Sequence, residues 1–286
     1  MNRLVLIDGN AILHRAYHAL PPLTAPDGSV VNAVYGFVSI LIKIFNDLRP
    51  THMAVAFDRP EKTFRKELFK DYQAKRPEMD SDLVTQIPKV QDVVRAFGIP
   101  IYEAAGYEAD DVLATLASQC QMDEVVIVTG DKDILQLVDD KKGVKVFMPT
   151  KGLSEGKLYG EAEVVEKMGV TAAQIPELKA LMGDSSDNYP GVAGIGPKTA
   201  VDLITRYGNI DALYKSDGLT EKLLKGKESA FLSRDLATIR NDVPVEMKTL
   251  EPLETLDTPE ARRKLEEFHF PSLLKRLAGG EVMPKE

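Results

Sequence analysis

Three short apolar runs, each ending in aspartate, constrain the fold of this chain more than any other feature. They are rich in β-branched residues and comprise LVLID at 4–8, MAVAFD at 53–58 and VVIVTGD at 125–131. Helical apolar spacing at residues 33–48 and 84–97 separates them, and IPIYEA adds a short strand. This alternation predicts an α/β fold with a parallel sheet. Because functional groups lie at the carboxyl ends of such strands, the aspartates are expected at one edge.

The sequence pattern of the chain changes after about residue 170. From there on, short helical stretches are punctuated by glycine and proline, and no further strand is predicted. With 286 residues, the chain exceeds what one hydrophobic core usually organises. We therefore expect two units, an α/β domain at 1–170 and a helical one at 171–286 that ends in two helices between Thr258 and Leu277.

Neither a membrane span nor a secretory leader is predicted. No stretch approaches the roughly 20 apolar residues that cross a bilayer, and the N-terminal MNRLVLIDGN lacks a long apolar segment. A cytoplasmic location without a membrane partner is expected. The single cysteine, Cys120, has no companion for a disulfide or a thiolate metal site, so it is interpreted as a helix-packing residue.

Nine acidic residues recur at special places in the sequence. Three end the apolar runs and one follows the third run, three lie at the start of the helix EADDVLATLA, and two lie within LMGDSSDNYPG. They are Asp8, Asp58, Glu108, Asp110, Asp111, Asp131, Asp133, Asp184 and Asp187. Acids in a first helical turn also stabilise the helix dipole, which is the simpler interpretation of residues 108–111. One or two would suffice for that purpose, however, and three repel one another unless a cation lies among them.

The type of these side chains indicates which cation. Carboxylate oxygens without histidine or cysteine partners favour Mg²⁺ or Mn²⁺ over zinc, and the four histidines are scattered along the chain. More carboxylates than one octahedral ion can use suggest two ions, the arrangement that stabilises both the attacking and the leaving oxygen of a phosphodiester. The predicted reaction is phosphoryl transfer to water.

Two segments are candidates for DNA contact, although the net charge of −8 argues against a generally basic surface. Residues 59–76 carry more basic than acidic side chains, and Tyr72 among them could stack on an unpaired base. A solvated helix face is the alternative. GVAGIGPKTA at 191–200 resembles a helix-hairpin-helix, in which backbone amides and a helix N-terminus approach a phosphate; an ordinary glycine-rich turn is the alternative. The candidate contacts are Arg65, Lys70, Tyr72, Lys75, Arg76, Gly194, Gly196, Lys198 and Thr199.

Taken in order, these motifs carry a family resemblance. They are LVLIDGN, FD at 57–58, GYEADDVLATLA, VTGDKDILQLV and LMGDSSDNYPGVAGIGPKTA. The chain resembles the 5′ nuclease domain of bacterial DNA polymerase I and, more broadly, the flap endonuclease family, over essentially its whole length. The resemblance implies a PIN-like three-layer domain with a mainly parallel central sheet, followed by a helix-hairpin-helix (H3TH) subdomain. It also implies work at the bacterial nucleoid.

Residue roles follow from the same resemblance. The positions of Asp8, Asp58, Glu108 and Asp110 would surround a first metal ion, and the other five carboxylates would build a second site. A K⁺ ion at the helix-hairpin-helix is a further expectation. A helical arch over the active site would correspond to residues 62–82. Family members carry Tyr-Lys-x-x-Arg there, whereas this chain has Gln73 after the tyrosine, so Arg65, Lys70 or Lys75 would have to supply the catalytic cation, and Arg65 and Lys75 are the candidates taken as catalytic.

The resulting functional hypothesis is a monomeric 5′–3′ exonuclease and 5′-flap endonuclease of replication and repair. Its partners would be DNA with 5′ flaps, nicks or single-strand/double-strand junctions. A PIN-type ribonuclease and a non-catalytic module that binds branched DNA are the alternatives. The sequence leaves open whether the chain stands alone or is joined to a polymerase domain.

Overall fold

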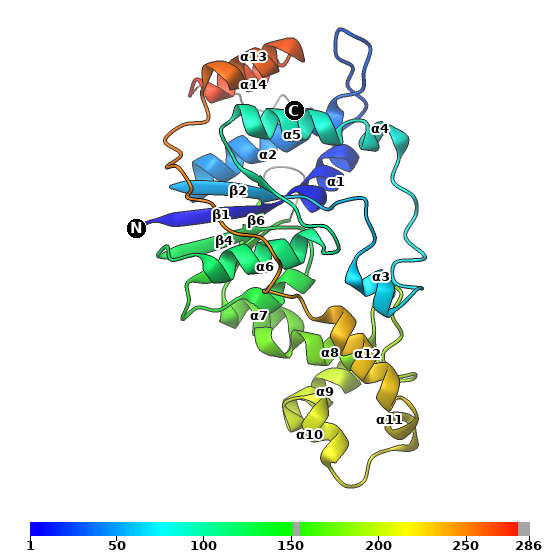
Figure 1. Cartoon of the computed structure of the whole chain (residues 1–286). Coiled ribbons are helices and arrows are strands. Elements are labelled where there is room, and N and C mark those ends of the chain that lie inside the picture. The colour runs from blue at the N-terminus through cyan, green and yellow to red at the C-terminus, as the bar shows by residue number, and fades with distance from the viewer. Residues whose placement is uncertain (151–154, 280–286) are drawn as a thin grey trace.

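A six-stranded sheet forms the centre of the computed structural model, which describes residues 1–150 and 155–279 (Figure 1). Its order is β3-β2-β1-β4-β5-β6, with β6 antiparallel to β5 and all other neighbours parallel. The strands are β1 (Arg3–Asp8), β2 (His52–Ala56), β3 (Ile101–Tyr102), β4 (Glu124–Val128), β5 (Val144–Pro149) and β6 (Gly156–Tyr159). The fold class predicted from the sequence is confirmed.

Helices cover both faces of the sheet, because its strands alternate apolar side chains between two cores. Val5 and Ile7 of β1 face one core, together with α1 (Gly9–Ala19), α2 (Asn32–Leu48) and α5 (Ile87–Ala96). Leu4 and Leu6 face the other core, where α6 (Ala109–Gln119) packs. Burying both faces explains why the strands are continuous apolar runs.

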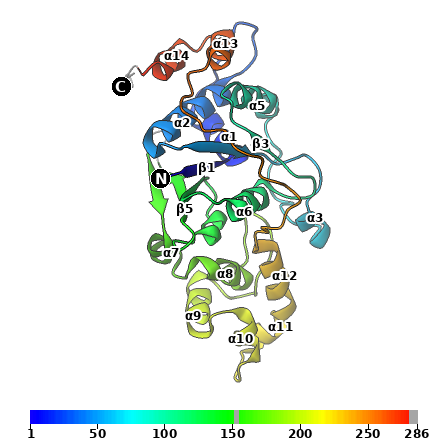
Figure 2. The same cartoon turned by 60° about the vertical axis from the view of Figure 1, so that its left-hand side comes forward.

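The helical part of the chain lies below the sheet in Figure 1 and keeps that place after rotation in Figure 2. Its elements are α7 (Glu161–Met168), the 3₁₀ turn η2 (Ala172–Gln174), α8 (Ile175–Met182), α9 (Pro197–Tyr207), α10 (Ile210–Lys215), α11 (Glu221–Lys225) and α12 (Lys227–Ala237). The chain then runs back past the sheet, and α13 (Pro259–Glu267) and α14 (Pro271–Leu277) pack on α5 and α2. The predicted division at residue 170 stays a prediction, and residues 280–286 lie outside the described ranges.

Some local predictions differ from the structure. Strands β5 and β6 were not among the predicted strands. The segment 62–82, expected as a helical arch, contains the short helix α3 (Phe64–Leu68), turns, and the first residues of α4 (Ser81–Val84). Within the described ranges, no helix is long and apolar enough to cross a membrane.

Candidate active site

The sheet topology brings the three strand-terminal aspartates to one edge. Asp8 is the last residue of β1, Asp58 follows β2 and Asp131 follows β4, and β1 lies between the other two strands. Asp8 also caps α1: its Oδ1 accepts a hydrogen bond from Ala11 N at 2.9 Å, and its Oδ2 accepts one from Thr129 Oγ1 at 2.7 Å. Both oxygens are therefore fixed in direction.

A glycine after Asp8 is required by close packing. A Cβ at Gly9 would lie 2.5 Å from Phe57 Cε1 and 2.7 Å from Ala56 O. Because no side chain fits there, the start of α1 approaches the end of β2 closely. The Asp-Gly pair in LVLIDGN therefore reflects the geometry that sets Asp8 beside the neighbouring strand.

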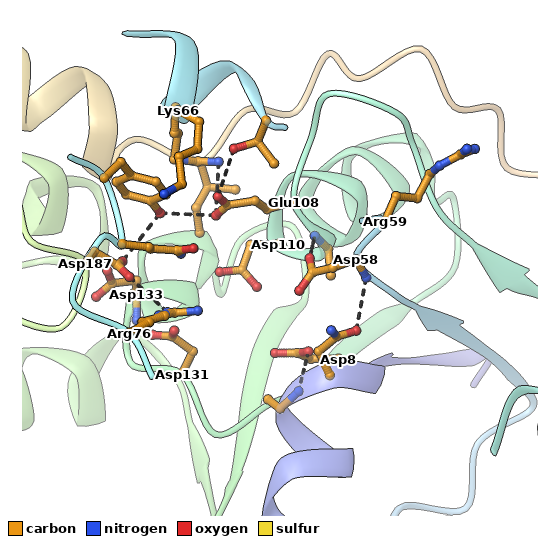
Figure 3. A pocket seen from close by; sticks show the side chains of 18 of the residues that line it. Asp8, Asp58, Arg59, Lys66, Arg76, Glu108, Asp110, Asp131, Asp133 and Asp187 are labelled. Atoms are coloured by element: carbon orange, nitrogen blue, oxygen red, sulfur yellow. Dashed lines mark hydrogen bonds and ion pairs between the residues drawn. The ribbon is translucent and has the colours of Figure 1, made fainter. Parts of the chain in front are cut away.

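The first turn of α6 supplies the next carboxylates. Asp58 Oδ1 accepts a hydrogen bond from Ala109 N at 2.7 Å, which joins the end of β2 to the start of this helix. Glu108 Oε1 accepts from Thr63 Oγ1 at 3.2 Å, and its Oε2 accepts from Tyr72 Oη at 3.2 Å. Asp110 points into the space between these groups (Figure 3).

Two adjoining cavities collect eight of the nine predicted carboxylates. A cavity of about 610 Å³ is lined by Asp8, Asp58, Glu108, Asp110, Asp131, Asp133 and Asp187. A second, of about 620 Å³, shares Asp131, Asp133 and Asp187, adds Asp184, and extends to Pro197 and Val201 at the start of α9. Asp111 lines neither cavity.

Crowding and burial change the acidity of this cluster. Burial, with the neighbouring negative charges of Asp58 and Asp131, raises the pKa of Asp8 to about 7. Burial and the surrounding carboxylates raise the pKa of Asp110 well above its usual value. Burial also raises the pKa of Glu108 to about 7 and that of Asp133 to about 6. The negative charge of this carboxylate cluster is therefore not balanced by the positive charges around it.

The chemistry of the donors fits divalent cations that prefer oxygen ligands. At the same time, no group of three or more His, Cys, Asp or Glu side chains within 1–150 and 155–279 already stands in a metal-holding arrangement. Small side-chain movements would therefore have to accompany metal binding.

Two protein cations compensate part of the charge, and one of them was not predicted. Lys179 Nζ lies 2.7 Å from Asp133 Oδ1 and pairs with Asp184, whose pKa it and Ser186 lower to about 2 despite burial. Arg76 Nη2 lies 2.9 Å from Asp187 Oδ1. A lysine inside the otherwise apolar run LKALMG was the signal available in the sequence.

The basic segment 59–76 divides into buried and open side chains. The sequence predicts that Arg65 contacts DNA and acts in catalysis; in the structure its side chain borders the 610 Å³ cavity but is buried and paired with Asp111. Tyr72 is buried too; it borders the same cavity, and its ring stacks on Tyr189 with 6.5 Å between the ring centroids. Lys66 and Arg76 line the 610 Å³ cavity.

The other predicted contacts of this segment lie away from that cavity. Lys70 is exposed, and Lys75 lines a separate hollow with Asp184 and Asn188. Gln73 has a left-handed backbone with φ 54°, and its N–H donates to Asp187 O at 2.8 Å. The segment is thereby fastened to the loop that carries Asp187.

The helix-hairpin-helix has the geometry that its sequence predicts. Gly194 has φ 79°, a conformation that favours glycine, and Gly196 precedes the first residue of α9. Lys198 and Thr199 are exposed in the first turn of that helix. The free amides of this helix start and the lysine form a surface suited to a phosphate.

A mostly parallel sheet with a carboxylate-lined cavity at its edge, next to a helix-hairpin-helix, is the arrangement expected of a metal-dependent nuclease. Residues 3–169 match the family described as 5′–3′ exonuclease, N-terminal resolvase-like domain, and residues 170–262 match 5′–3′ exonuclease, C-terminal SAM fold. The chain therefore belongs to the 5′–3′ exonuclease family, as its motifs predicted.

The curated relatives that match this chain are longer proteins. DNA polymerase I of Caldicellulosiruptor bescii is 42% identical over 293 residues, covering 99% of this chain and 34% of the relative. DNA polymerase I of Bacillus subtilis is 43% identical over 253 residues, covering 86% of this chain and 28% of the relative. The chain thus spans about a third or less of the length of these proteins.

Solved structures agree in fold at low identity. The bacteriophage T5 flap endonuclease in complex with DNA and metal ions superposes with a TM-score of 0.70 at 20% identity, covering 97% of each chain. The catalytic core of Rad2 in complex with DNA substrate gives 0.64 at 18% identity, covering 96% of this chain and 92% of that one. These likenesses establish the fold.

Proposed function

We propose that this chain hydrolyses DNA phosphodiesters at 5′ flaps, nicks and single-strand/double-strand junctions, with two divalent ions, Mg²⁺ or Mn²⁺. The observation that carries the proposal is the carboxylate cluster, whose members Asp8, Glu108 and Asp110 have raised pKa values and line one cavity. The similar T5 flap endonuclease structure contains DNA and metal ions, and the similar Rad2 structure contains DNA substrate, which supports the same assignment.

The carboxylates divide between two ends of the site. Asp8, Asp58, Glu108 and Asp110 are proposed to hold the first ion at the sheet edge. Asp131, Asp133, Asp184 and Asp187 are proposed to hold the second, where Lys179 and Arg76 now pair with three of them. Bound divalent ions would offset the mutual repulsion of the carboxylates and polarise the scissile phosphate.

The surrounding residues would orient the DNA. Lys66 and Arg76 line the cavity and would pair with phosphate oxygens of the strand to be cut. Lys132 and Lys167 line the neighbouring cavity, which extends from the carboxylates to the start of α9. Lys198 and the α9 amides would hold the backbone of the duplex beyond it. These contacts are to phosphate, so no sequence preference is expected.

A labelled 5′-flap duplex tests the proposal directly. Incubation with Mg²⁺ should release the flap and short 5′ products, whereas EDTA should stop cleavage without abolishing binding. A matched RNA flap should be cut poorly. Binding without turnover would favour a branched-DNA-binding module, and preferred cleavage of RNA would favour a PIN-type ribonuclease.

Lys198→Ala should weaken flap binding about tenfold. One lost phosphate contact also lowers the slope of log K against log salt by roughly 1. Binding is measured in Ca²⁺ across a salt series, with Lys215→Ala, a change on α10, as the control. An unchanged slope would place Lys198 away from the DNA.

We also propose that the chain is joined to a polymerase domain and acts as a monomer. We further propose that a K⁺ ion binds at the helix-hairpin-helix and that the protein acts at the bacterial nucleoid. Comparing cleavage with and without K⁺ would test the K⁺ site. Sizing the products of substrates that differ only in flap length would measure the balance of exonuclease and endonuclease action.

A further inference from the structure

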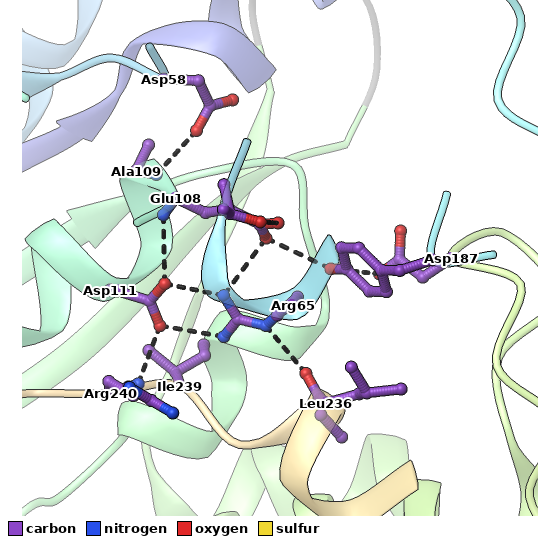
Figure 4. Close-up of polar contacts among 12 residues, drawn as sticks. Asp58, Arg65, Glu108, Ala109, Asp111, Asp187, Leu236, Ile239 and Arg240 are labelled. Atoms are coloured by element: carbon purple, nitrogen blue, oxygen red, sulfur yellow. Dashed lines mark hydrogen bonds and ion pairs between the residues drawn. The ribbon is translucent and has the colours of Figure 1, made fainter. Parts of the chain in front are cut away.

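We propose that Arg65 and Asp111 form a buried positioning pair, which sets the start of α6 and the wall of the cavity, and that Asp111 is not a metal ligand. This inference rests on the proposed nuclease function. The pair lies behind the carboxylate cluster, between α3, α6 and the segment that follows α12 (Figure 4).

Four of the five N–H donors of Arg65 make hydrogen bonds inside the protein. Its Nη1 and Nη2 donate to Asp111 Oδ2 and Oδ1 at 2.7 and 2.9 Å, a bidentate geometry. Its Nε donates to Leu236 O at 2.9 Å, and Nη2 also donates to Thr238 O at 3.0 Å. The residue is 2% exposed. Arg65 borders the 610 Å³ cavity, but contact with a DNA phosphate would disrupt these bonds, so a guanidinium held in this way serves to orient its neighbours.

Both carboxylate oxygens of Asp111 also accept hydrogen bonds within the protein. Besides Arg65, its Oδ1 accepts from Arg240 N at 2.8 Å and its Oδ2 accepts from Glu108 N at 3.1 Å. It is 0% exposed and lines neither of the two cavities that hold the other predicted ligands. Coordinating a metal ion through either oxygen would disrupt the buried bidentate pair and one of the two backbone hydrogen bonds.

The pair joins three segments that all border the active site. Arg65 belongs to α3, Asp111 to the first turn of α6 beside Glu108 and Asp110, and Leu236 to the end of α12. Leu236, with Ala237 and Ile239, lines the 610 Å³ cavity. Arg65 Nη1 also lies 3.4 Å from Glu108 Oε2, so one cation fixes Glu108 as well. A shift of this helix start would displace two proposed metal ligands together.

The decisive variant replaces both partners with apolar residues, Arg65→Met with Asp111→Leu. Each single replacement leaves a buried charge without its bidentate partner and should lower the melting temperature by roughly 10 °C. The double variant removes both charges and should regain part of that loss; the rest persists because the backbone groups that the pair bonds lose their partners. Its kcat for flap cleavage should nevertheless stay about 100-fold below that of the parent chain, because small misplacements of catalytic groups cost that much. KM and flap binding in Ca²⁺ should change little.

Two further measurements separate this role from its alternatives. Mn²⁺ titration by calorimetry should show that Asp111→Asn retains two-ion binding, weakened only a few-fold, whereas Asp110→Asn loses one ion. Arg65→Lys should recover part of the kcat. The control is Arg262→Met with Asp257→Leu, which removes a more exposed bidentate pair, at 2.5 and 2.6 Å at the start of α13, and should leave kcat unchanged.

Three results would overturn the proposal. Full recovery of kcat in the double apolar variant would reduce the pair to a contributor to stability. Loss of one bound Mn²⁺ in a folded Asp111→Asn protein would make Asp111 a ligand. An effect on KM and binding alone would point to Arg65 contacting DNA. Failure of the parent chain to cleave any flap would instead refute the nuclease function itself.

Discussion

Asp110→Asn should lower flap cleavage by about 1000-fold or more and, in metal-free solution, raise the melting temperature. Both effects come from one property, the burial of a carboxylate among carboxylates. Burial and the charges of Asp8, Asp131 and Asp58 raise the pKa of Asp110. Without metal the folded chain must therefore bury a charge or take up a proton, and asparagine avoids both costs. With metal, the lost ligand weakens charge stabilisation at the phosphate.

Cleavage is followed in single turnover with Mg²⁺, and unfolding is followed by thermal melts in EDTA. Glu166→Gln provides the control, because Glu166 is an exposed carboxylate of α7 that pairs with Lys157, and it should change neither quantity appreciably. A folded Asp110→Asn protein that cuts at the normal rate would remove Asp110 from the metal site. An unchanged melting temperature would mean that the cluster is not under electrostatic strain.

The metal-free chain should lose stability as the pH rises from about 4 to about 7. The raised pKa values of Asp8, Glu108 and Asp133, about 7, 7 and 6, mean that the folded state keeps protons that the unfolded state has released. Stability falls with pH wherever the folded state binds more protons. The loss for each group is on the order of a few kcal/mol, because one pKa unit corresponds to ~1.4 kcal/mol. The lowered pKa of Asp184, about 2, has the opposite effect, but at more acidic pH.

Divalent ions should reverse this trend. They bind the folded state with its carboxylates ionised, so excess Mg²⁺ should stabilise the chain most at pH 7 and above, by ~2.7 kcal/mol at one hundred times the dissociation constant. Thermal melts across this pH range, in EDTA and in Mg²⁺, measure both curves. Asp8→Asn with Glu108→Gln should flatten the EDTA curve. Parallel curves with and without Mg²⁺ would contradict binding at these carboxylates.

Local patterns in the sequence were sufficient to predict the sheet edge. Burial on both faces makes β1, β2 and β4 continuous apolar runs, and the aspartates at their ends can be located without a structure. The turn around Gly194 and the start of α9 were predictable for a similar reason, since backbone geometry there requires particular residues. Strand β6 was harder to predict, because it is mostly exposed and pairs along the edge of the sheet.

The partners of charged side chains were not predictable in this way. Arg65 and Lys75 belong to one basic segment, yet Arg65 pairs with Asp111 inside the protein and Lys75 lies in a different hollow. Lys179 lies in an apolar stretch of the sequence, and its partner Asp133 is brought to it only because α8 packs against η1 (Asp133–Leu137). Contacts between segments more than 40 residues apart decide such pairings.

By itself, the sequence determined the alternation of strands and helices, the acidic residues at the strand ends and the glycine-rich turn, because each depends on neighbours along the chain. Only the tertiary structure decided which carboxylates share a cavity, which are neutralised by Lys179, Arg76 or Arg65, and which pKa values rise. The physical reason is that the energy of a charge depends on its burial and on every other charge within a few ångströms, and packing alone sets both.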